Sequence, residues 1–485
     1  MNQDIRNLEP KALWNNFSDL NAVPRASKKE ERVIAFMVAF GKKLGLETIV
    51  DPIQNVIIKK SASPGMENRK TVVLQSHLDM VHQKNSDTKF DFDKEGIKML
   101  IQDGWVTADG TTLGADNGLG VAAIMSVLES NEIAHPAIEA LFTIDEETGM
   151  TGAKGLQGDY LNGEILLNLD TEEDDEIDIG CAGGVDVTAT KNYEEIKLDG
   201  NCKAFKISVT GLRGGHSGMD IHRGFGNANK IMNQIFEATQ NIANIAQIKG
   251  GSLRNAIPRE SFATLVCDTK NAATFIAKAE EVSSQIKKGF LTIEPNLICS
   301  IEAIHCPLTA MSNADQSLLI EAVKNAHNGV FKMSEEMKGL VEASNNIAKI
   351  NLANGSIEIG CLTRSSVEKS KEEVANQLTE SFEKEGFKVI LSGSYPGWKP
   401  NASSSILDVM SNLYENLFDK KPDIVACHAG LECGILGTHY PDMDMISFGP
   451  TIKGAHSPDE RANIKSAQKF WKYLLETLKN IPVKA

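Results

Sequence analysis

The feature that most constrains the fold is a series of short apolar segments that alternate with helical patterns between about residues 30 and 180. Four segments rich in apolar and β-branched residues have the length of buried strands: NVIIKK, TVVLQSH, IEALFTIDEE and GEILLNLD. Between them, NGLGVAAIMSVLES has the apolar spacing and the small residues of a packed helix. Strands that alternate with helices predict an α/β fold, with a mostly parallel open sheet flanked by helices. Such sheets bind ligands beyond the carboxyl ends of their strands.

The pattern changes after residue 186 and returns near residue 396. CKAFKISVTGL followed by NANKIMNQIFEATQNIANI indicates strands combined with long charged helices, whereas ILDVMSNLYENLF and MDMISFGP resume the first pattern. A chain of 485 residues also exceeds the usual size of one domain. We therefore predict one domain in two parts, residues 1–186 and 396–485, interrupted by an inserted α+β domain of residues 187–395.

Charge and composition exclude several classes of partner. The chain has 50 basic and 65 acidic residues, a formal charge of -15, which argues against a nucleic-acid or anionic-membrane surface. No apolar run approaches the roughly 18 to 20 residues that span a bilayer. The first residues lack the pattern of a signal peptide, and the eight cysteines form no CxxC pair. We expect a cytoplasmic protein with free thiols.

Polar residues of the kind that bind metal ions stand where the predicted strands end. The candidates are His77, Asp79, Asp116, Glu146, Glu147, Asp170 and, late in the chain, His456. Any one of them has an ordinary explanation, such as a helix N-cap for Asp116. Two imidazoles and several carboxylates at one sheet edge are instead the ligands of a pair of borderline divalent ions such as zinc, for which cobalt or manganese could substitute.

Glu146 and Glu147 stand side by side in DEETG, where one metal ligand would have sufficed. On an ordinary surface two such neighbours would simply be solvated. Hydrolysis, however, needs a base that is not bound to metal and can move a proton from water to the leaving group. With Gly149 turning the chain at the strand exit, we assign Glu147 to metal and Glu146 to the base.

Eight segments, in order over nearly the whole chain, carry a more specific signal. They are HLDMV, GTTLGADNGLG, DEETGM, NLDTEE, GLRGGHSG, GGSLRNAIPRE, HAGLECG and GPTIKGAHSPDE. Together they resemble the aminoacyl-histidine dipeptidases, a branch of the co-catalytic di-zinc metallopeptidases that include carboxypeptidase G and the aminoacylases (clan MH). The resemblance implies that the two-part domain is catalytic and that the inserted domain is a lid.

The resemblance also implies a role for each metal-site residue: His77 and Asp170 on one zinc ion, Glu147 and His456 on the other, and Asp116 bridging the two. Asp79 would orient the His77 imidazole, as a carboxylate behind a ligand often does. Glu146 would be the general base that acts on a zinc-bridging hydroxide. A cis peptide bond is implied between Asp116 and Asn117.

Further residues are implied in substrate binding. His216 of the inserted domain would stabilise the tetrahedral oxyanion, although an ordinary loop histidine is the alternative. Asn255 would contact substrate. The free carboxylate of a dipeptide needs a cation, for which Arg364 is the candidate and Arg254 and Arg259 are rivals.

Glu432, in HAGLECG, would accept the free ammonium of the substrate, and a structural role for it remains the alternative. The inserted domain is long compared with the lids of shorter relatives, in which a partner subunit supplies the histidine. We infer that one chain holds the whole site, so that any homodimer would be incidental to the chemistry.

The predicted function is a metal-dependent dipeptidase for unblocked dipeptides, including Xaa-His and β-alanyl-histidine. A related deacylase of N-acyl amino acids or a carboxypeptidase would share the metal ligands and is the alternative. A binding protein that had lost catalysis would lack a ligand or the base, and none is missing here. Neither a GxSxG nor a GxxxxGK[ST] segment is present, which argues against a serine hydrolase and a nucleotide enzyme.

Overall fold

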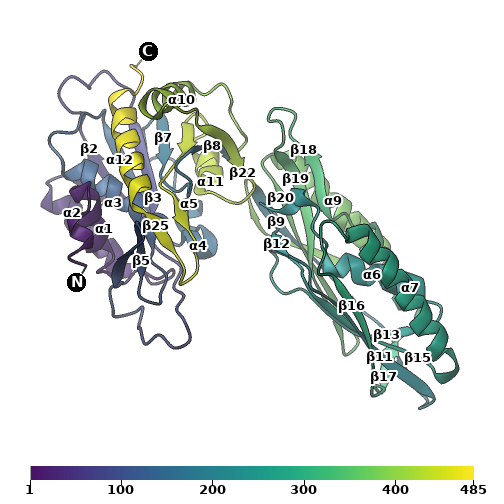
Figure 1. The fold of residues 1–485 in the computed structure, drawn as a ribbon. Helices are drawn as coiled ribbons and strands as arrows, with labels where there is room; N and C mark the ends of the chain where they lie inside the picture. The colour runs from purple at the N-terminus through teal and green to yellow at the C-terminus, as the bar shows by residue number, and fades with distance from the viewer. Residues whose placement is uncertain (1, 485) are drawn as a thin grey trace. The chain divides into compact units, whose positions relative to one another are not determined.

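A computed structural model describes residues 2–484, which form two compact units (Figure 1). Unit 1 holds the described residues up to Cys181, then Trp398–Ala426, and those from Leu431 onward. Unit 2 holds Ala182–Gly397 and the short strip Cys427–Gly430. This strip was not predicted to leave the first domain. It belongs to unit 2 because the N–H of Ala182 donates to the carbonyl oxygens of Cys427 and Ala429, each at 2.9 Å.

Unit 1 is built on a sheet of eight strands. In spatial order they are β1 (Glu47–Val50), β2 (Val56–Lys60), β6 (Ile138–Thr143), β3 (Val72–His77), β7 (Ile165–Asn168), β23 (Asp444–Ser447), β8 (Glu176–Cys181) and β22 (Asp423–Cys427). The four central strands β6, β3, β7 and β23 run parallel, whereas β1 and β2 join antiparallel at one side. The predicted α/β class is confirmed, and the sheet is mixed, with its parallel part at the centre.

Helices cover this sheet. They are α1 (Lys11–Leu20), α2 (Glu31–Lys43), α3 (Ala115–Glu129), α4 (Glu146–Gly149), α5 (Thr151–Gly155), α10 (Ser405–Phe418), α11 (Glu432–His439) and α12 (Ile464–Lys479), with the 3-10 turn Ile5–Asn7. A small second sheet joins β4 (Met99–Gln102), β5 (Trp105–Ala108), β24 (Ile452–Lys453) and β25 (Arg461–Asn463). None of the helices in residues 2–484 combines the length and apolar character needed to cross a bilayer.

Helix α3 packs closely against the strand ends that carry the predicted site. Its side chains are buried on nearly every face, as expected for a helix in the centre of an α/β unit. A Cβ atom at Gly120 would lie 2.5 Å from Ser76 Oγ and 2.7 Å from the Leu169 carbonyl oxygen. Glycine is therefore needed here for the helix to approach the ends of β3 and β7.

Unit 2 is an antiparallel sheet with helices packed on it. The strands, in spatial order, are β16 (Ile298–Ile304), β11 (Cys202–Thr210), β15 (Ser261–Asp268), β13 (Asn244–Gly250), β19 (Val341–Ala353), β20 (Ser356–Ser365), β9 (Gly183–Asn192) and β21 (Lys388–Tyr395), and β18 (Gly329–Met333) pairs with β19. Two short pairs, β10 (Glu195–Lys197) with β17 (Thr309–Met311) and β12 (Gly215–His216) with β14 (Ala256–Ile257), complete the strands. The antiparallel order agrees with the α+β character predicted for the insert.

The helices of unit 2 are α6 (Ala228–Thr239), α7 (Ala272–Phe290), α8 (Asn313–Asn325) and α9 (Glu368–Lys384), with 3-10 turns at Ile221–Arg223 and Thr269–Asn271. Figure 1 shows α6, α7 and α9 along the sheet, and their apolar faces form one core with it. For example, Phe205 of β11 stacks on Phe275 of α7 with ring centroids 5.1 Å apart.

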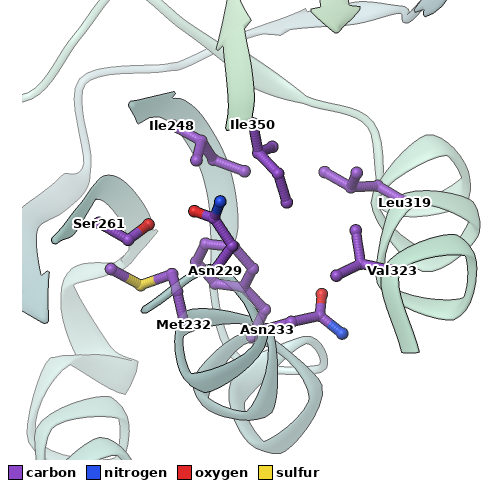
Figure 2. A pocket seen from close by; sticks show the side chains of 9 residues that line it. Asn229, Met232, Asn233, Ile248, Ser261, Leu319, Val323 and Ile350 are labelled. Carbon is purple, nitrogen blue, oxygen red and sulfur yellow. The ribbon is translucent and has the colours of Figure 1, made fainter. Parts of the chain in front are cut away.

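A small pocket lies in this core, between α6, α8 and the sheet (Figure 2). Its lining is Asn229, Met232, Asn233, Phe236, Ile248, Ser261, Leu319, Val323 and Ile350. None of these nine residues carries a charge or belongs to the predicted site. We therefore read the pocket as a packing gap of unit 2.

Candidate functional site

The predicted metal ligands of unit 1 gather at the carboxyl edge of its parallel strands. His77 is the last residue of β3, and Asp170 follows β7 by two residues. Because β3, β6 and β7 are parallel, their carboxyl ends meet at one edge, where α4 brings Glu147 after β6. Asp116 lies in the first turn of α3.

Two groups of ligand atoms share the carboxylate of Asp116. In the first group, His77 Nε2 lies 3.1 Å from Asp116 Oδ1 and 3.5 Å from Asp170 Oδ1. In the second, His456 Nε2 lies 3.2 Å from Asp116 Oδ2 and 2.9 Å from Glu147 Oε2. Each oxygen of Asp116 thus faces a different imidazole, an arrangement suited to a bridging ligand between two ions.

The chemistry of these groups fits divalent cations. Within each group the potential ligand atoms lie within 4.8 Å of one another. Glu147 Oε1 is buried without a hydrogen-bond partner among the described residues, so this oxygen has free capacity to coordinate. Mixed imidazole and carboxylate ligands suit zinc and similar ions.

The pKa values of the two histidines also indicate that the cluster favours positive charge. Hydrogen bonds to Asp116 and Glu147 raise the pKa of His456 to about 11. Burial alone would lower the pKa of His77, yet Asp170 and Asp116 raise it well above its usual value. The surrounding carboxylates thus favour positive charge at both imidazoles. His456 also has φ 64°, a left-handed conformation that is uncommon for histidine.

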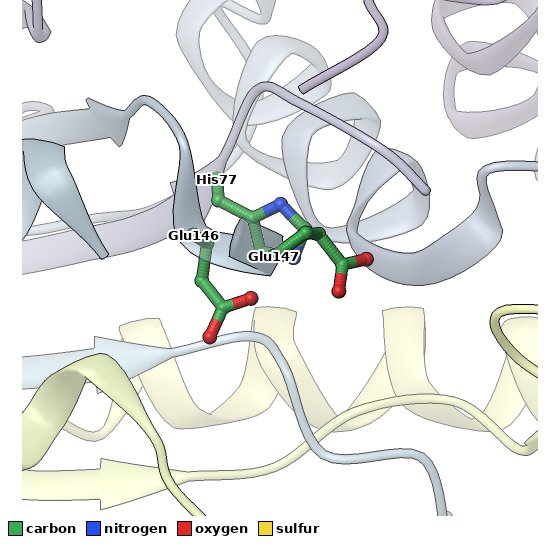
Figure 3. A group of neighbouring side chains, drawn as sticks. All are labelled: His77, Glu146 and Glu147. Atoms are coloured by element: carbon green, nitrogen blue, oxygen red, sulfur yellow. The ribbon is translucent and has the colours of Figure 1, made fainter. Parts of the chain in front are cut away.

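Glu146 lies beside this cluster without joining either group of ligands that includes Asp116. Figure 3 shows that the side chains of Glu146 and Glu147 diverge beside the His77 ring. Burial raises the pKa of Glu146 well above its usual value, and the charges of Asp170 and Glu147 raise it further. A buried carboxyl group with a raised pKa is a stronger base once ionised than an exposed glutamate, which suits an acid or base catalyst.

The turn that separates the two glutamates differs from the predicted strand exit at Gly149. Glu146 and Glu147 open the short helix α4, and the left-handed residues on either side of it are Asp145 (φ 53°) and Met150 (φ 50°). Gly149 has no positive φ. The helical turn, and not a glycine, directs the two side chains apart.

Asp79 lies behind His77, where the resemblance implied an orienting carboxylate. His77 Nδ1 lies 3.1 Å from the carbonyl oxygen of Asp79 and 3.4 Å from its Oδ1. The fully buried carboxylate also accepts the backbone N–H groups of Glu146 (3.0 Å) and Glu147 (3.3 Å). Asp79 thereby connects one ligand loop to the other.

A third acidic group, Glu30, Asp79 and Asp145, is not a comparable metal site. Lys28 Nζ lies 2.7 Å from Asp145 Oδ2, and the N–H of Lys28 donates to Glu30 at 2.9 Å. Asp79 in turn accepts the N–H groups described above. The negative charges of all three carboxylates are therefore stabilised by groups of the protein, without a metal ion.

The predicted cis peptide bond between Asp116 and Asn117 is present. Asn117 donates from Nδ2 to the carbonyl oxygen of Leu169 at 2.8 Å and to the carboxylate of Asp170. The residue after Asp116 thus holds the loop that carries Asp170.

Two charged residues of unit 1 were missed by sequence reasoning. Glu460 accepts backbone N–H groups on the segment that leads to Asp116, and Arg25 donates to carbonyl oxygens of the same region. Glu460 stands in the segment GAHSPDE, four residues after His456, so its position offered a weak signal. Arg25 offered none.

His216 lies in unit 2 on β12, beside Arg364. Its Nδ1 accepts the N–H groups of Gly218 (3.3 Å) and Met219 (3.1 Å), which leaves the ring proton of the neutral form on Nε2. Burial and the Arg364 charge lower the pKa of His216 to about 4. The ring is therefore a neutral donor at physiological pH.

Arg364 Nη2 lies 3.5 Å from His216 Nε2, so two donors point to one region. Arg364 is 5% exposed, and the other hydrogen-bond partners of its guanidinium are Tyr395 OH at 3.1 Å and Ser217 Oγ at 3.4 Å. No carboxylate pairs with it among the residues that the structure describes, which leaves its charge available to an anion.

The rival arginines are placed differently. Arg254 is committed to its own unit, since it donates to the carbonyl oxygens of Val187 and Cys361 and lies 3.3 Å from Asp186 Oδ2. Arg259 is exposed. Asn255 is exposed too. Its backbone carbonyl oxygen accepts the N–H of Ser217 at 2.8 Å, next to His216 in the sequence.

Glu432 is fully buried in unit 1, at the start of α11. Its Oε2 accepts hydrogen bonds from Gln75 Nε2 (2.7 Å) and Thr143 Oγ1 (2.6 Å), whereas Oε1 has no partner among the described residues. Burial raises the pKa of Glu432 to about 7. The neighbouring His428 belongs to unit 2 and is bonded to Ser344 Oγ at 2.9 Å.

Known proteins share this fold and sequence. The profile of a family described as "Peptidase family M20/M25/M40" matches residues 73–480. The cytosol non-specific dipeptidase of Escherichia coli is 40% identical over 483 residues, which cover 99% of this chain and 100% of that protein. The crystal structure of aminoacylhistidine dipeptidase from Vibrio alginolyticus is 42% identical, with a TM-score of 0.91 over 99% of each chain. Aminopeptidase PepT from Bacillus cereus shares the fold at 17% identity, with a TM-score of 0.57 over 98% of this chain and 99% of that one.

Proposed function

The chain belongs to peptidase family M20/M25/M40 and is a hydrolase, and on this premise we propose that it is a cytoplasmic dipeptidase for unblocked dipeptides. One observation carries the proposal: two groups of metal-type ligands share Asp116, and a buried carboxyl group, Glu146, stands beside them. The two relatives that are at least 40% identical are both named dipeptidases, one of them an aminoacylhistidine dipeptidase. The proposed substrates include Xaa-His and β-alanyl-histidine.

The proposed cofactor is a pair of divalent ions, zinc in the first place. The first ion would be held by His77 and Asp170, the second by Glu147 and His456, and both by Asp116. When bound, the ions supply Lewis-acid activation of a water molecule and of the scissile carbonyl group. Asp79 holds the His77 ring in the orientation that presents Nε2.

Glu146 is the proposed general base. It takes the proton of the attacking water and returns it to the nitrogen of the leaving amine, so that water adds across the C–N bond and two amino acids leave. Burial raises the pKa of its carboxyl group, which makes the carboxylate a better proton acceptor in the first transfer.

Residues of unit 2 are proposed to recognise the anionic parts of the substrate. Arg364 is the proposed partner of the substrate carboxylate, because the hydrogen-bond contacts of its guanidinium are to hydroxyl and imidazole groups and not to a carboxylate. His216 donates from Nε2 to the oxyanion that forms during attack. Asn255 is the proposed further contact. The residues proposed for metal binding and for substrate binding all belong to this chain, so no homodimer is proposed for catalysis.

Glu432 is the proposed acceptor for the free ammonium group of the substrate. The carboxylate is fully buried, so the contact would use Oε1, the oxygen without a protein partner. A cation that reached it would satisfy this oxygen, as a buried acceptor requires.

The test is hydrolysis of a small panel by the zinc-loaded enzyme: Ala-His, β-alanyl-His, Leu-Gly, N-acetyl-Ala-His and a tripeptide. We expect cleavage of the three free dipeptides only. Glu146→Ala should reduce kcat by at least about a hundredfold without loss of bound metal, because a general base contributes about that much. Glu164→Ala, at an exposed carboxylate of the same unit, is the matched control.

Two results would overturn this proposal. Cleavage of N-acetyl-Ala-His in preference to Ala-His would make the protein a deacylase. Full activity of Glu146→Ala would remove Glu146 from the mechanism.

A further inference from the structure

We propose that Glu460 and Arg25 are positioning residues, which hold the segment Leu113–Asp116 from its two sides and thereby fix the bridging carboxylate. The inference rests on the proposed two-metal site, because it concerns how that site keeps its geometry. Glu460 belongs to none of the groups formed around Asp116, and the protonated guanidinium of Arg25 has no lone pair to offer a cation. Both act on backbone atoms.

The carboxylate of Glu460 binds four consecutive backbone N–H groups. Oε2 accepts from Leu113 (2.7 Å) and Gly114 (2.9 Å), and Oε1 accepts from Ala115 (2.8 Å) and Asp116 (3.3 Å). Glu460 is 2% exposed, so these bonds compete little with water. Four converging N–H groups require a curled backbone, which Gly114 provides with φ 68°.

Arg25 binds the same segment through its carbonyl oxygen. Its Nη2 donates to the carbonyl oxygen of Gly114 at 2.5 Å, and its Nη1 donates to those of Leu78 (3.1 Å) and Asp79 (3.0 Å). Arg25 is 2% exposed. A Cβ at Gly114 would lie 2.5 Å from Arg25 Nη2, so this contact also requires glycine.

The two residues tie together loops that are remote in sequence. Glu460 follows His456 by four residues and grips the segment that ends in Asp116, while Arg25 connects that segment to the two residues after His77. The bridging carboxylate must face two imidazoles at once, and a loop free to shift would lose one of them. Burial lowers the pKa of Arg25 to about 10, and the charge of Glu460 opposes this shift, so each residue favours the other in its buried position.

The test is titration of metal-free protein with Co²⁺, followed by its visible absorption, and with Zn²⁺, followed by calorimetry. We expect Glu460→Gln to weaken binding in at least one of the two metal steps by 10- to 100-fold, roughly the effect of losing groups that orient ligands. The matched control is Glu139→Gln. Glu139 is a buried carboxylate at the start of β6 that accepts the N–H groups of Asn162 (2.7 Å) and Gly163 (3.0 Å), away from the metal ligands at the other end of the strand.

Three outcomes are informative. Weaker binding in Glu460→Gln with wild-type binding in Glu139→Gln supports the proposal. Wild-type metal affinity in Glu460→Gln, or equal losses in both variants, overturns it. Wild-type protein that binds fewer than two ions would contradict the proposed metal centre itself, which separates the failure of that premise from the failure of this inference.

A measurement on the wild type covers the case in which Glu460→Gln does not fold. Hydrogen exchange of the metal-free protein should show slow exchange for the amides of Leu113–Asp116, because Glu460 holds them without metal. Exchange as fast as that of an exposed loop would overturn the proposal.

Discussion

Histidine has opposite properties in two clusters of the molecule. The metal-type cluster of unit 1 is His77, Asp116, Glu147, Asp170 and His456, and the donor cluster of unit 2 is His216 and Arg364. In unit 1, carboxylates raise the pKa of His456 to about 11, so its ring stands in for a cation. In unit 2, burial and the Arg364 charge lower the pKa of His216 to about 4, so its ring is a neutral donor. The first cluster collects carboxylates and imidazoles, which suit a cation, and the second collects a guanidinium and a neutral imidazole donor, which suit an anion. The surroundings of an imidazole, and not its presence, therefore decide its function.

Removal of metal ions should give the largest effect and should separate the two clusters. Chelation should abolish hydrolysis, and added Zn²⁺ should restore it, because the proposed reaction depends on Lewis-acid activation. Hydrogen exchange should become faster at residues 146–149 and 454–457, which carry Glu147 and His456, and should not change in the strands of unit 2. Hydrolysis by enzyme that elemental analysis shows to be metal-free would contradict the assignment of the unit 1 cluster to metal ions.

The next largest effect is expected from His216→Asn. Loss of a donor to a developing oxyanion costs about 3 to 4 kcal/mol, so kcat should fall by roughly 10² to 10³. Metal content should not change, since His216 belongs to the donor cluster. The measurement is steady-state kinetics with Ala-His, together with metal analysis of the purified variant.

The pH dependence of His216 sharpens this point. Because its pKa is lowered to about 4, the ring stays neutral as the pH falls through 6.5 and gains a proton only near pH 4. A ¹H–¹⁵N NMR titration should therefore show His216 as neutral, with the proton on Nε2, at pH 6. If His216 gained its proton near pH 6.5 instead, burial and the Arg364 charge would not be stabilising its neutral form.

A smaller effect is expected from Arg364→Lys. A lysine keeps the charge but loses the forked geometry, so kcat/KM for dipeptides should fall about 10- to 100-fold, equivalent to about 1.4 to 2.7 kcal/mol, mainly through KM. Arg259→Lys, at the exposed rival, is the control and should behave as the wild type. The reverse result would transfer the carboxylate site to Arg259.

The cluster of unit 1 could be predicted from local sequence patterns more readily than the cluster of unit 2. His77, Glu147 and Asp170 each follow a buried apolar strand, and the carboxyl ends of parallel strands meet at one edge, so their convergence could be argued from the chain. His216 and Arg364 lie 148 residues apart on antiparallel elements. The resemblance to known peptidases singled out His216, and Arg364 was chosen among three arginines because a substrate carboxylate needs a forked cation.

Residues that act through the backbone were the hardest to predict. Glu460 binds amides of Leu113–Asp116 that are 344 to 347 residues away. No sequence pattern near Glu460 predicts a contact with that segment. The helical turn at Glu146 was missed for a related reason. It depends on the left-handed conformation of Asp145, a residue type that adopts this conformation only in particular surroundings.

The smallest effect on turnover is expected at Glu432, a carboxylate of unit 1 that belongs to neither metal group. In the metal-free protein its pKa is raised by burial from 4.5 to about 7. As the pH rises, the unfolded chain loses this proton near 4.5 and the folded protein only near 7, so the contribution of Glu432 to the free energy of unfolding falls across that window, by about 3 kcal/mol. Glu432→Gln does not ionise. Its stability relative to the wild type should therefore rise between pH 5 and pH 8, as measured by urea unfolding in metal-free buffer.

The same variant decides between the two roles of Glu432. Glutamine can still accept the hydrogen bonds of Gln75 and Thr143 through its amide oxygen, so the buried contacts remain. It cannot neutralise an ammonium group, and the KM for Ala-His should rise about tenfold, the equivalent of about 1.4 kcal/mol for a lost charged partner. An unchanged KM together with the altered pH dependence of stability would make Glu432 a structural residue. Recognition of the substrate ammonium would then have to come from another acceptor, and the cation-binding chemistry of unit 1 would be confined to the metal ligands.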